Sequence, residues 1–221
     1  MTQKKLDEAL FDAVEQGGLE KVRELIAEGA QVNARNMAMS CPLHWAAEKG
    51  HLDIVKYLIE EKGAQLDARN DDALQPLHYA AWHGHLPVVG YLLSKGARVG
   101  AKAKDDGRPI HFAAWSGHLD VVQCLIEKQG EDADAKDGGG WRPLHYAARE
   151  GHLPVVKYLV VEKGVDSEAR TSRKKTPFDL SAEHPAVREF LKEWNSPKKA
   201  IAEHLKRQRK LGSLRPKGPA L

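Results

Sequence analysis

Residues 76–97 read PLHYAAWHGHLPVVGYLLSKGA, and this stretch decides the fold because the chain repeats it. Its opening motif returns as PLHWAA from residue 42, PIHFAA from 109, PLHYAA from 143 and a degenerate PFDLSA from 177, at spacings of 34, 33, 34 and 34 residues. A weaker unit, ALFDAVEQGGLEKVRELIAEGA (9–30), aligns with the pattern at an offset of 33. Internal repetition at a period of about 20–50 residues is typical of solenoids and related arrays.

Each unit is predicted to form a helical hairpin. A proline suits the first position of a helix, where no backbone N–H is needed, and the Leu and Ala residues after it recur at helical spacing. A glycine ends this short helix, and LDIVKYLIEEKG (52–63) predicts a second one. Its expected apolar face consists of Leu52, Val55, Leu58 and Ile59. Polar residues between units favour an extended turn, and because one hairpin cannot cover its own apolar face, neighbouring hairpins must stack.

Length and composition fit a folded chain. Its 221 residues are 42% apolar, which is enough to bury a sizeable core. The longest apolar run, residues 88–93 counted with Gly90, has six residues, whereas a membrane-spanning helix needs about 20. The N-terminus is charged and lacks the apolar stretch of a secretory signal, and two cysteines fit a reducing compartment. We therefore expect a cytoplasmic protein, with the nucleus as the alternative.

The repeated pattern PLHxAAxxGHLxVVxxLLxxGA resembles the ankyrin repeat, and the resemblance covers residues 6–194. It implies an all-α ankyrin-repeat solenoid of about six stacked helical hairpins with extended turns, in residues 1–195. Its units start near residues 9, 42, 76, 109, 143 and 177, and a basic tail, residues 196–221, follows. The threonine that usually precedes the proline survives only as Thr176; the middle units have Cys41, Gln75, Arg108 and Arg142 there.

Helical geometry identifies three positions of each first helix that point away from the core. The resemblance implies that this face lines the concave groove, where partners bind. Down the repeats these positions carry Trp45, Glu48, Lys49, Tyr79, Trp82, His83, Phe112, Trp115, Ser116, Tyr146, Arg149 and Glu150. Trp82 and Trp115 are equivalent positions of adjacent repeats, and tryptophan and arginine dominate binding hot spots. We therefore expect a partner segment to be anchored on Trp82, Trp115 and Arg149.

The turn tips extend this candidate surface. Apolar residues stand there where a loop usually has polar ones: Met37, Met39, Ala73, Leu74 and Trp141. Exposed apolar groups beside an aromatic groove predict one continuous binding patch. The alternative explanation for Trp82 and Trp115 is that they pack between repeats. The same alternative applies to the aromatic ring that follows the motif histidine in each repeat: Trp45, Tyr79, Phe112 and Tyr146.

Eleven histidines raise the question of a metal site or a general base. Eight of them recur once per repeat, in two series: His44, His78, His111 and His145, and His51, His85, His118 and His152. Groups one repeat apart are too distant to share a metal, and the resemblance implies that the first series bonds turn backbone. No catalytic or phosphate-binding motif occurs. We expect no enzyme activity, cofactor, metal or small-molecule substrate, and we expect Cys41, which lies near a turn, to be accessible.

The tail is strongly basic. Residues 196–221 carry a net charge of +7, against −4 for the rest of the chain. The run KRQRK, which includes Lys206, Arg207, Arg209 and Lys210, resembles a nuclear import signal. Ser196, which precedes a proline and two lysines, resembles a proline-directed phosphorylation site. Few apolar residues are present, so the tail is predicted to be flexible, or helical only when bound.

These observations support three hypotheses on function. The leading one is a monomeric, non-catalytic scaffold or adaptor that holds a segment of another protein in its concave groove. The second is a chromatin-type reader, in which two tryptophans cage a methylated lysine and Glu48 or Glu150 supplies the negative charge. The third is association of the tail with nucleic acid or an anionic membrane, which its positive charge would make strongly dependent on salt.

Overall fold

The computed structural model describes residues 2–196, and every regular element within them is a helix. In chain order these elements are α1 (Gln3–Glu15), α2 (Leu19–Ala27), α3 (Pro42–Lys49), α4 (Leu52–Lys56), η1 (Tyr57–Glu61), α5 (Pro76–Trp82), α6 (Leu86–Ser94), α7 (Pro109–Trp115), α8 (Leu119–Gln123), η2 (Cys124–Lys128), α9 (Pro143–Arg149), α10 (Leu153–Lys157), η3 (Tyr158–Glu162), α11 (Pro177–Leu180) and α12 (Pro185–Trp194). The segments η1, η2 and η3 are π-helical and continue α4, α8 and α10 directly.

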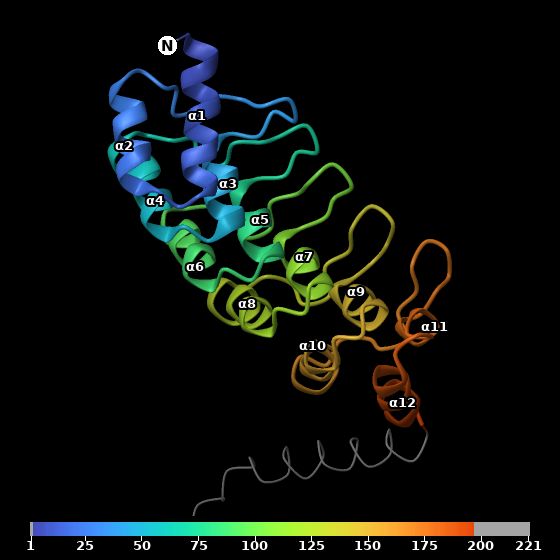
Figure 1. The fold of residues 1–221 in the computed structure, drawn as a ribbon. Helices are drawn as coiled ribbons and strands as arrows, with labels where there is room; N and C mark the ends of the chain where they lie inside the picture. Colours follow the sequence, from blue (N-terminus) through green and yellow to red (C-terminus); the bar gives the residue numbers. More distant parts are fainter. Residues whose placement is uncertain (1, 197–221) are drawn as a thin grey trace, which may run out of the picture.

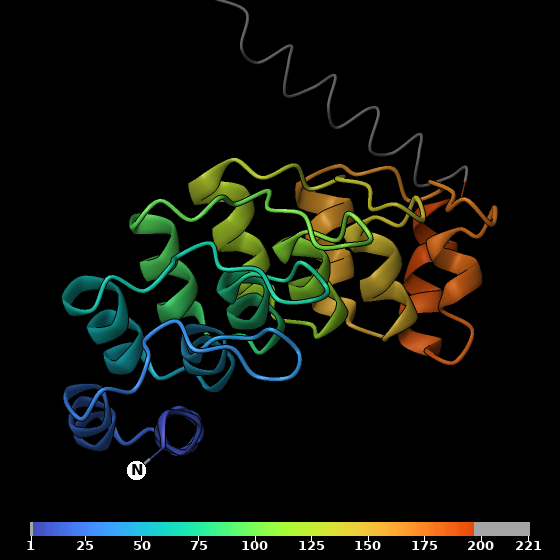
Figure 2. The same ribbon diagram turned by 90° about the horizontal axis from the view of Figure 1, so that it is seen from above.

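The helices form two rows, and long turns project from one of them (Figure 1). Odd-numbered helices pack against the next odd-numbered helix and make the inner row, while the even-numbered ones lie behind them. We call the long turns fingers; they comprise residues 31–41, 65–75, 98–108, 132–142 and 166–176. Figure 2 shows the stack from above, with each hairpin beside the next. The expected all-α solenoid of stacked hairpins is confirmed.

Small and β-branched residues form the continuous core. The alanine pair of each opening motif, such as Ala80 and Ala81, is fully buried and lets inner-row helices approach closely, and so is the valine pair Val88 and Val89 of α6. In α4 and η1 the buried residues are Ile54, Val55, Tyr57 and Leu58, whereas Leu52 and Ile59 are half-buried. The four residues of the predicted apolar face therefore all lie in or against the core, with Leu52 and Ile59 at its edge.

Some second helices contain one extra residue. In α6, which is α-helical throughout, the closing backbone hydrogen bond runs from Ala97 N to Leu92 O (3.0 Å). In the unit with η1, the equivalent bond runs from Ala64 N to Leu58 O (2.8 Å) and encloses one more residue. A π-turn is the form in which an α-helix takes up a single inserted residue. The units with η1, η2 and η3 precede the 34-residue spacings, and the α6 unit precedes the 33-residue one.

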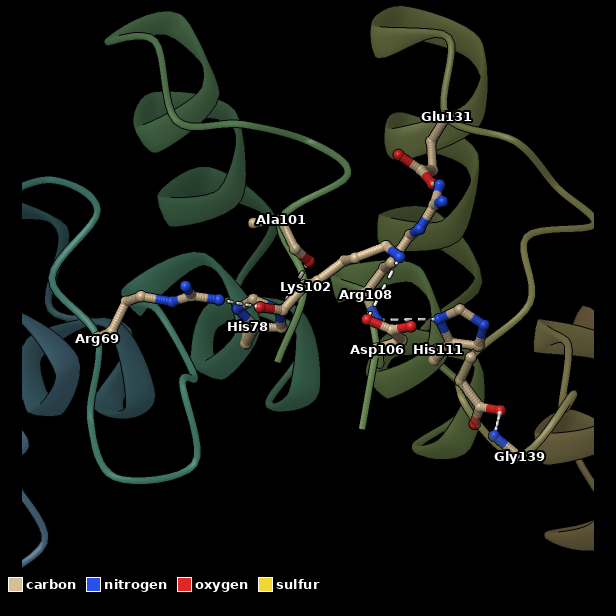
Figure 3. Close-up of polar contacts among 10 residues, drawn as sticks. Arg69, His78, Ala101, Lys102, Asp106, Arg108, His111, Glu131 and Gly139 are labelled. Carbon is tan, nitrogen blue, oxygen red and sulfur yellow. Dashed lines mark hydrogen bonds and ion pairs between the residues drawn. The ribbon is translucent and has the colours of Figure 1, made fainter. Parts of the chain in front are cut away.

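The first histidine series ties each unit to the next. Nδ1 of His78 accepts the backbone N–H of Gln75 (3.1 Å), and its Nε2 lies 3.0 Å from the carbonyl oxygen of Ala101 in the following finger (Figure 3). The same pair of bonds recurs at His111 and His145. At His44, Nδ1 accepts the N–H of Cys41, but Nε2 lies 3.0 Å from the carbonyl oxygen of Leu74, near the end of the following finger. The role that the resemblance implied for this series is confirmed. The ring thereby satisfies the N–H of the N-cap residue, which is the bond that the third helical residue supplies in a capping box.

These rings are neutral at pH 7. Burial lowers the pKa of His44 and of His78 to about 4, and burial also lowers the pKa of His111 and of His145 below the usual value. The neutral form is required because Nδ1 accepts a hydrogen bond while Nε2 donates one to a carbonyl oxygen. The histidines are therefore structural groups, and protonation at Nδ1 would break the bond that each ring accepts from the N–H at the start of its own helix.

The second histidine series packs on glycines. Nε2 of His152 lies 2.8 Å from the carbonyl oxygen of Trp115, and its ring covers Gly117, whose φ is +78°. A Cβ on Gly117 would lie 2.4 Å from His152 Nδ1, so only glycine fits there. The same contact joins Gly17, Gly50, Gly84 and Gly151 to His51, His85, His118 and His184, respectively. Sequence reasoning missed this pairing, although the repeated Gly-His dipeptide was its signal.

Gly90, unlike Gly117, has room for a side chain, and its substitution tests the effect of a glycine on helix stability. It lies inside α6 and is exposed, and no atom lies within 4 Å of the position that a Cβ would occupy there. Gly90→Ala should therefore raise the free energy of unfolding by about 0.5–1 kcal/mol, because alanine loses less backbone entropy in a helix. Urea denaturation followed by circular dichroism measures the change. A lower midpoint than that of the native chain would contradict the expectation.

Candidate functional site

Stacked aromatic rings cross the inner row. Trp82 and Trp115 lie with ring centroids 5.7 Å apart and planes 19° from parallel. Tyr79 stacks on Trp82 at 6.4 Å, Tyr146 stacks on Trp115 at 6.0 Å, and Trp141 packs on Tyr146 at 5.0 Å. We call these five residues the aromatic ladder. Trp115 is 37% exposed and Trp82 is half-buried, so the ladder lies at the surface and also packs against the repeats.

The repeat architecture brings these rings together. Trp82 is the last residue of α5 and Trp115 the last residue of α7, and these two helices pack side by side. Equivalent positions of adjacent units therefore meet directly. Arg149, the last residue of α9, places its guanidinium 5.7 Å from the ring centroid of Trp141 and covers the end of the ladder. The structure thus brings Trp82, Trp115 and Arg149 to one face.

The fingers next to the ladder are held by side chain and backbone bonds. Asn70 Oδ1 accepts the N–H groups of Asp72 and Leu74, and Asp137 Oδ1 accepts those of Gly139 and Trp141. Backbone bonds then join successive finger tips, from Lys104 N to Asp72 O (2.8 Å) and from Gly138 N to Asp105 O (2.8 Å). The tips therefore form a connected wall beside the inner-row helices.

The guanidinium groups at the finger bases add to this wall. Arg69 Nη2 donates to the carbonyl oxygen of Lys102 in the next finger (2.5 Å), and Arg35 Nη1 donates to that of Arg69 (3.1 Å) (Figure 3). The ammonium of Lys102 pairs with Asp106 at 3.3 Å. These cations serve the structure of the fingers and lie away from the ladder rings.

A pocket of about 290 Å³ lies between the fingers and the ladder. Four aromatic side chains line it: Trp82, Phe112, Trp115 and Tyr146. Three aspartates also line it, Asp72, Asp105 and Asp137, together with one lysine, Lys104. Sequence reasoning identified the rings but missed the aspartates, whose signal was their place in the finger tips that border the aromatic positions.

Asp137 is the fixed member of this acidic group. Its Oδ2 accepts a hydrogen bond from the Tyr146 hydroxyl at 2.6 Å. Burial and the neighbouring Asp137 carboxylate raise the pKa of Tyr146 well above its usual value, so the phenol keeps its proton. By contrast, no hydrogen bond or ion pair among residues 2–196 engages the carboxylate of Asp72 or of Asp105, and both residues are exposed.

Comparison with known proteins identifies the repeats. A family model described as ankyrin repeats in three copies matches residues 10–103 and 99–171. The chain belongs to the ankyrin repeat family. Ankyrin repeats generally mediate protein–protein interaction, and the family is typically non-catalytic. The inner-row face with its fingers is accordingly the candidate site of this ankyrin repeat protein.

One curated relative matches over a short stretch. Acyl-CoA-binding domain-containing protein 2 of Arabidopsis thaliana is 37% identical over 54 residues, which are 24% of this chain and 15% of that protein. Within residues 2–196 of the ankyrin repeat chain, no helix has the length and apolar character needed to cross a bilayer. The same part of the chain holds no group of three or more His, Cys, Asp or Glu side chains arranged for a metal ion.

Other predicted residues of the ankyrin repeat groove lie around the ladder. Phe112 packs on Trp82 at 5.5 Å, and the exposed His83 also stacks on Trp82, at 5.8 Å. Trp45 is separate: it is half-buried and packs edge-on against Phe11 at 6.0 Å. The ladder therefore gathers the predicted residues of the central repeats but not Trp45.

Two expectations about exposure are wrong. Leu74 is only 8% exposed, because the bonds of the finger turn it inward beside the pocket, where its side chain is part of the lining. Cys41 is fully buried, with Sγ 3.0 Å from His44 Nδ1, and burial raises the pKa of its thiol. Met37 and Met39 are exposed, as expected, whereas Trp141 is half-buried by its contact with Tyr146.

Most candidate residues of the basic tail lie outside the part of the chain that the structure describes. Lys206, Arg207, Arg209 and Lys210 lie beyond the described residues. Ser196, the candidate phosphorylation site, is half-buried, and its hydroxyl donates to the carbonyl oxygen of Glu193 at 2.7 Å. Its modification therefore stays a prediction.

Proposed function

We propose that this ankyrin repeat protein is a non-catalytic, monomeric adaptor that binds a segment of another protein along the aromatic ladder and the adjacent fingers. The observation that carries the proposal is the Trp82–Trp115 stack, which lies partly exposed beside a pocket. Rigid aromatic side chains supply large contact areas at a low entropic cost, and tryptophan is among the residues most enriched in hot spots.

The prepared geometry of this face supports the same proposal. Trp82 and Trp115 hold each other in place, and the backbone carbonyl of Trp115 is bonded to His152 of the next unit. The fingers are connected from tip to tip. A surface that is already ordered loses little conformational entropy when a partner binds, so a modest area of contact can give useful affinity.

The methyl-lysine hypothesis fits this geometry less well. The two indoles are nearly parallel and in stacking contact, so they leave no space between them for a methylated ammonium group. Glu48 and Glu150, which that hypothesis used as the negative charges, do not line the pocket. The tail hypothesis concerns residues outside the described part, and its test is the salt dependence of binding to nucleic acid or anionic vesicles.

The proposed function predicts a large effect at the stack. In Trp82→Ala/Trp115→Ala, the affinity for a partner isolated with the native full-length chain should fall by at least about tenfold, because two hot-spot side chains are lost. Isothermal titration calorimetry measures this change, and circular dichroism verifies that the variant is folded.

Val161→Ala is the matched control. Val161 is a large apolar residue, 50% exposed, on η3 in the outer row, away from the ladder. Its variant should bind the partner with native affinity. Unchanged affinity in a folded double tryptophan variant would remove the groove as the binding site.

A further inference from the structure

We propose that the pocket beside the ladder receives an arginine side chain of the bound partner, with the guanidinium packing against the aromatic lining and pairing with Asp72 and Asp105. This inference rests on the proposed function and names the chemistry that the partner must present. It follows from the charge of the pocket, the availability of its carboxylates and the shape of its aromatic wall.

The pocket favours a cation. Asp72, Asp105 and Asp137 line it against the single ammonium of Lys104, which gives a formal charge of −2. The one imidazole in the lining, His111, is neutral, because its Nδ1 accepts the Arg108 N–H and its Nε2 bonds to Ala135 O. Complementary charge inside a partly enclosed site selects partners and speeds their association.

Two of the carboxylates are free to bind a partner. Asp137 is occupied by Gly139, Trp141 and Tyr146, and its charge is fixed in place. Asp72 and Asp105 face solvent at equivalent positions of neighbouring fingers, and within residues 2–196 neither carboxylate has a hydrogen-bond or ion-pair partner. Adjacent carboxylates suit a guanidinium, which presents several N–H donors in a fixed, planar arrangement.

The aromatic wall favours arginine over lysine and methylated lysine. Trp82 and Trp115 stack on each other within 19° of parallel, so they form one aromatic wall of the pocket rather than a cage. A guanidinium is weakly hydrated and packs well against aromatic rings, whereas an ammonium is a compact, strongly hydrated charge and a methylated ammonium gains most when rings surround it. The molecule already uses this contact at the end of the ladder, where Arg149 covers Trp141 at 5.7 Å.

Small probes test the inference on the full-length chain. N-acetyl-arginine amide is titrated and the indole N–H signals of Trp82 and Trp115 are followed by NMR, after assignment with single Trp→Phe variants. Both signals should shift and saturate together. The citrulline analogue, which has the same shape but no charge, should leave them unshifted, and the lysine and trimethyllysine analogues should bind at least about threefold more weakly.

Charge variants give the matched comparison. Asp72→Asn/Asp105→Asn should weaken binding of the arginine probe by about tenfold, because each lost carboxylate removes a charge-assisted contact. Asp71→Asn removes an equally exposed carboxylate that does not line the pocket and should leave the affinity unchanged. An equal loss in both variants, or equal binding of the lysine or trimethyllysine probe, would overturn the inference.

Two further results separate this inference from the proposed function. If a partner needs Trp82 and Trp115 but binds Asp72→Asn/Asp105→Asn with native affinity, the groove stands and the arginine site is refuted. The basic tail is the competing occupant, so the arginine probe is also titrated into a full-length variant with Lys206, Arg207, Arg209 and Lys210 changed to alanine. Equal affinity supports a partner's arginine; a tenfold gain in affinity assigns the pocket to the tail and refutes it.

Discussion

Lowering the pH from 7.5 to 5 should reduce the free energy of unfolding by about 4 kcal/mol through His44 and His78 alone. The pKa of each ring is about 4 in the folded chain, where burial disfavours the charged form, and about 6.5 when unfolded. The unfolded chain therefore binds more protons as the pH falls below 6.5. The stabilisation is complete above this pH and is lost progressively down to about pH 4. Because the pKa of His111 and of His145 is also lowered, these two rings add to the loss of stability at low pH. Urea denaturation at the two pH values measures the effect.

A substitution assigns this loss to one ring. His78→Gln should be less stable than the native chain at pH 7.5, because it loses the bonds to Gln75 and Ala101. Since glutamine does not titrate, this difference should shrink by about 2 kcal/mol at pH 5. His83→Gln, at an exposed ring, should change the stability by less than about 0.5 kcal/mol at either pH. A difference between native chain and His78→Gln that stays constant with pH would refute the assignment.

Gly117→Ala should lower the free energy of unfolding by about 3 kcal/mol. A positive φ of +78° costs an alanine about 1–2 kcal/mol. The new Cβ would also lie 2.4 Å from His152 Nδ1, and the ring must move away from the carbonyl oxygen of Trp115, so a hydrogen bond worth about 1 kcal/mol is weakened. Thermal and urea denaturation measure the loss.

Gly63→Ala separates the two causes. Gly63 has a φ of +63° but no atom within 4 Å of the position of a Cβ, so its alanine variant should show only the backbone term, about 1–2 kcal/mol. Equal destabilisation of the Gly63 and Gly117 variants would show that the histidine contact contributes nothing. A larger loss in Gly117→Ala is the expected result.

Periodicity was enough to predict the hairpins, their order and the stacking of their inner helices, because each unit repeats the same apolar spacing. The stacking of Trp82 on Trp115 follows from the same register, since equivalent residues of adjacent units must be neighbours. Bonds between units were harder to predict. The contact of His152 with Gly117 joins residues 35 positions apart that belong to successive units, so the sequence of one unit does not reveal it.

The finger conformations could not be predicted from polarity alone. Leu74 looked like an exposed apolar residue, but Asn70 Oδ1 binds its N–H and turns it inward. The three aspartates of the pocket looked like ordinary loop residues, because their convergence depends on backbone bonds between fingers. Such arrangements combine local turn chemistry with contacts from the neighbouring unit, and neither can be read from the apolar pattern.

The π-turns have a consequence for how such a protein tolerates changes of length during evolution. The extra residue is taken up within the outer helix, behind the inner row, and the closing glycine still lies two residues before the next finger. A codon gained or lost at this point therefore leaves the ring-bearing helices in register. An insertion inside an inner helix would rotate every later ring on that helix by about 100° and would abolish the stack.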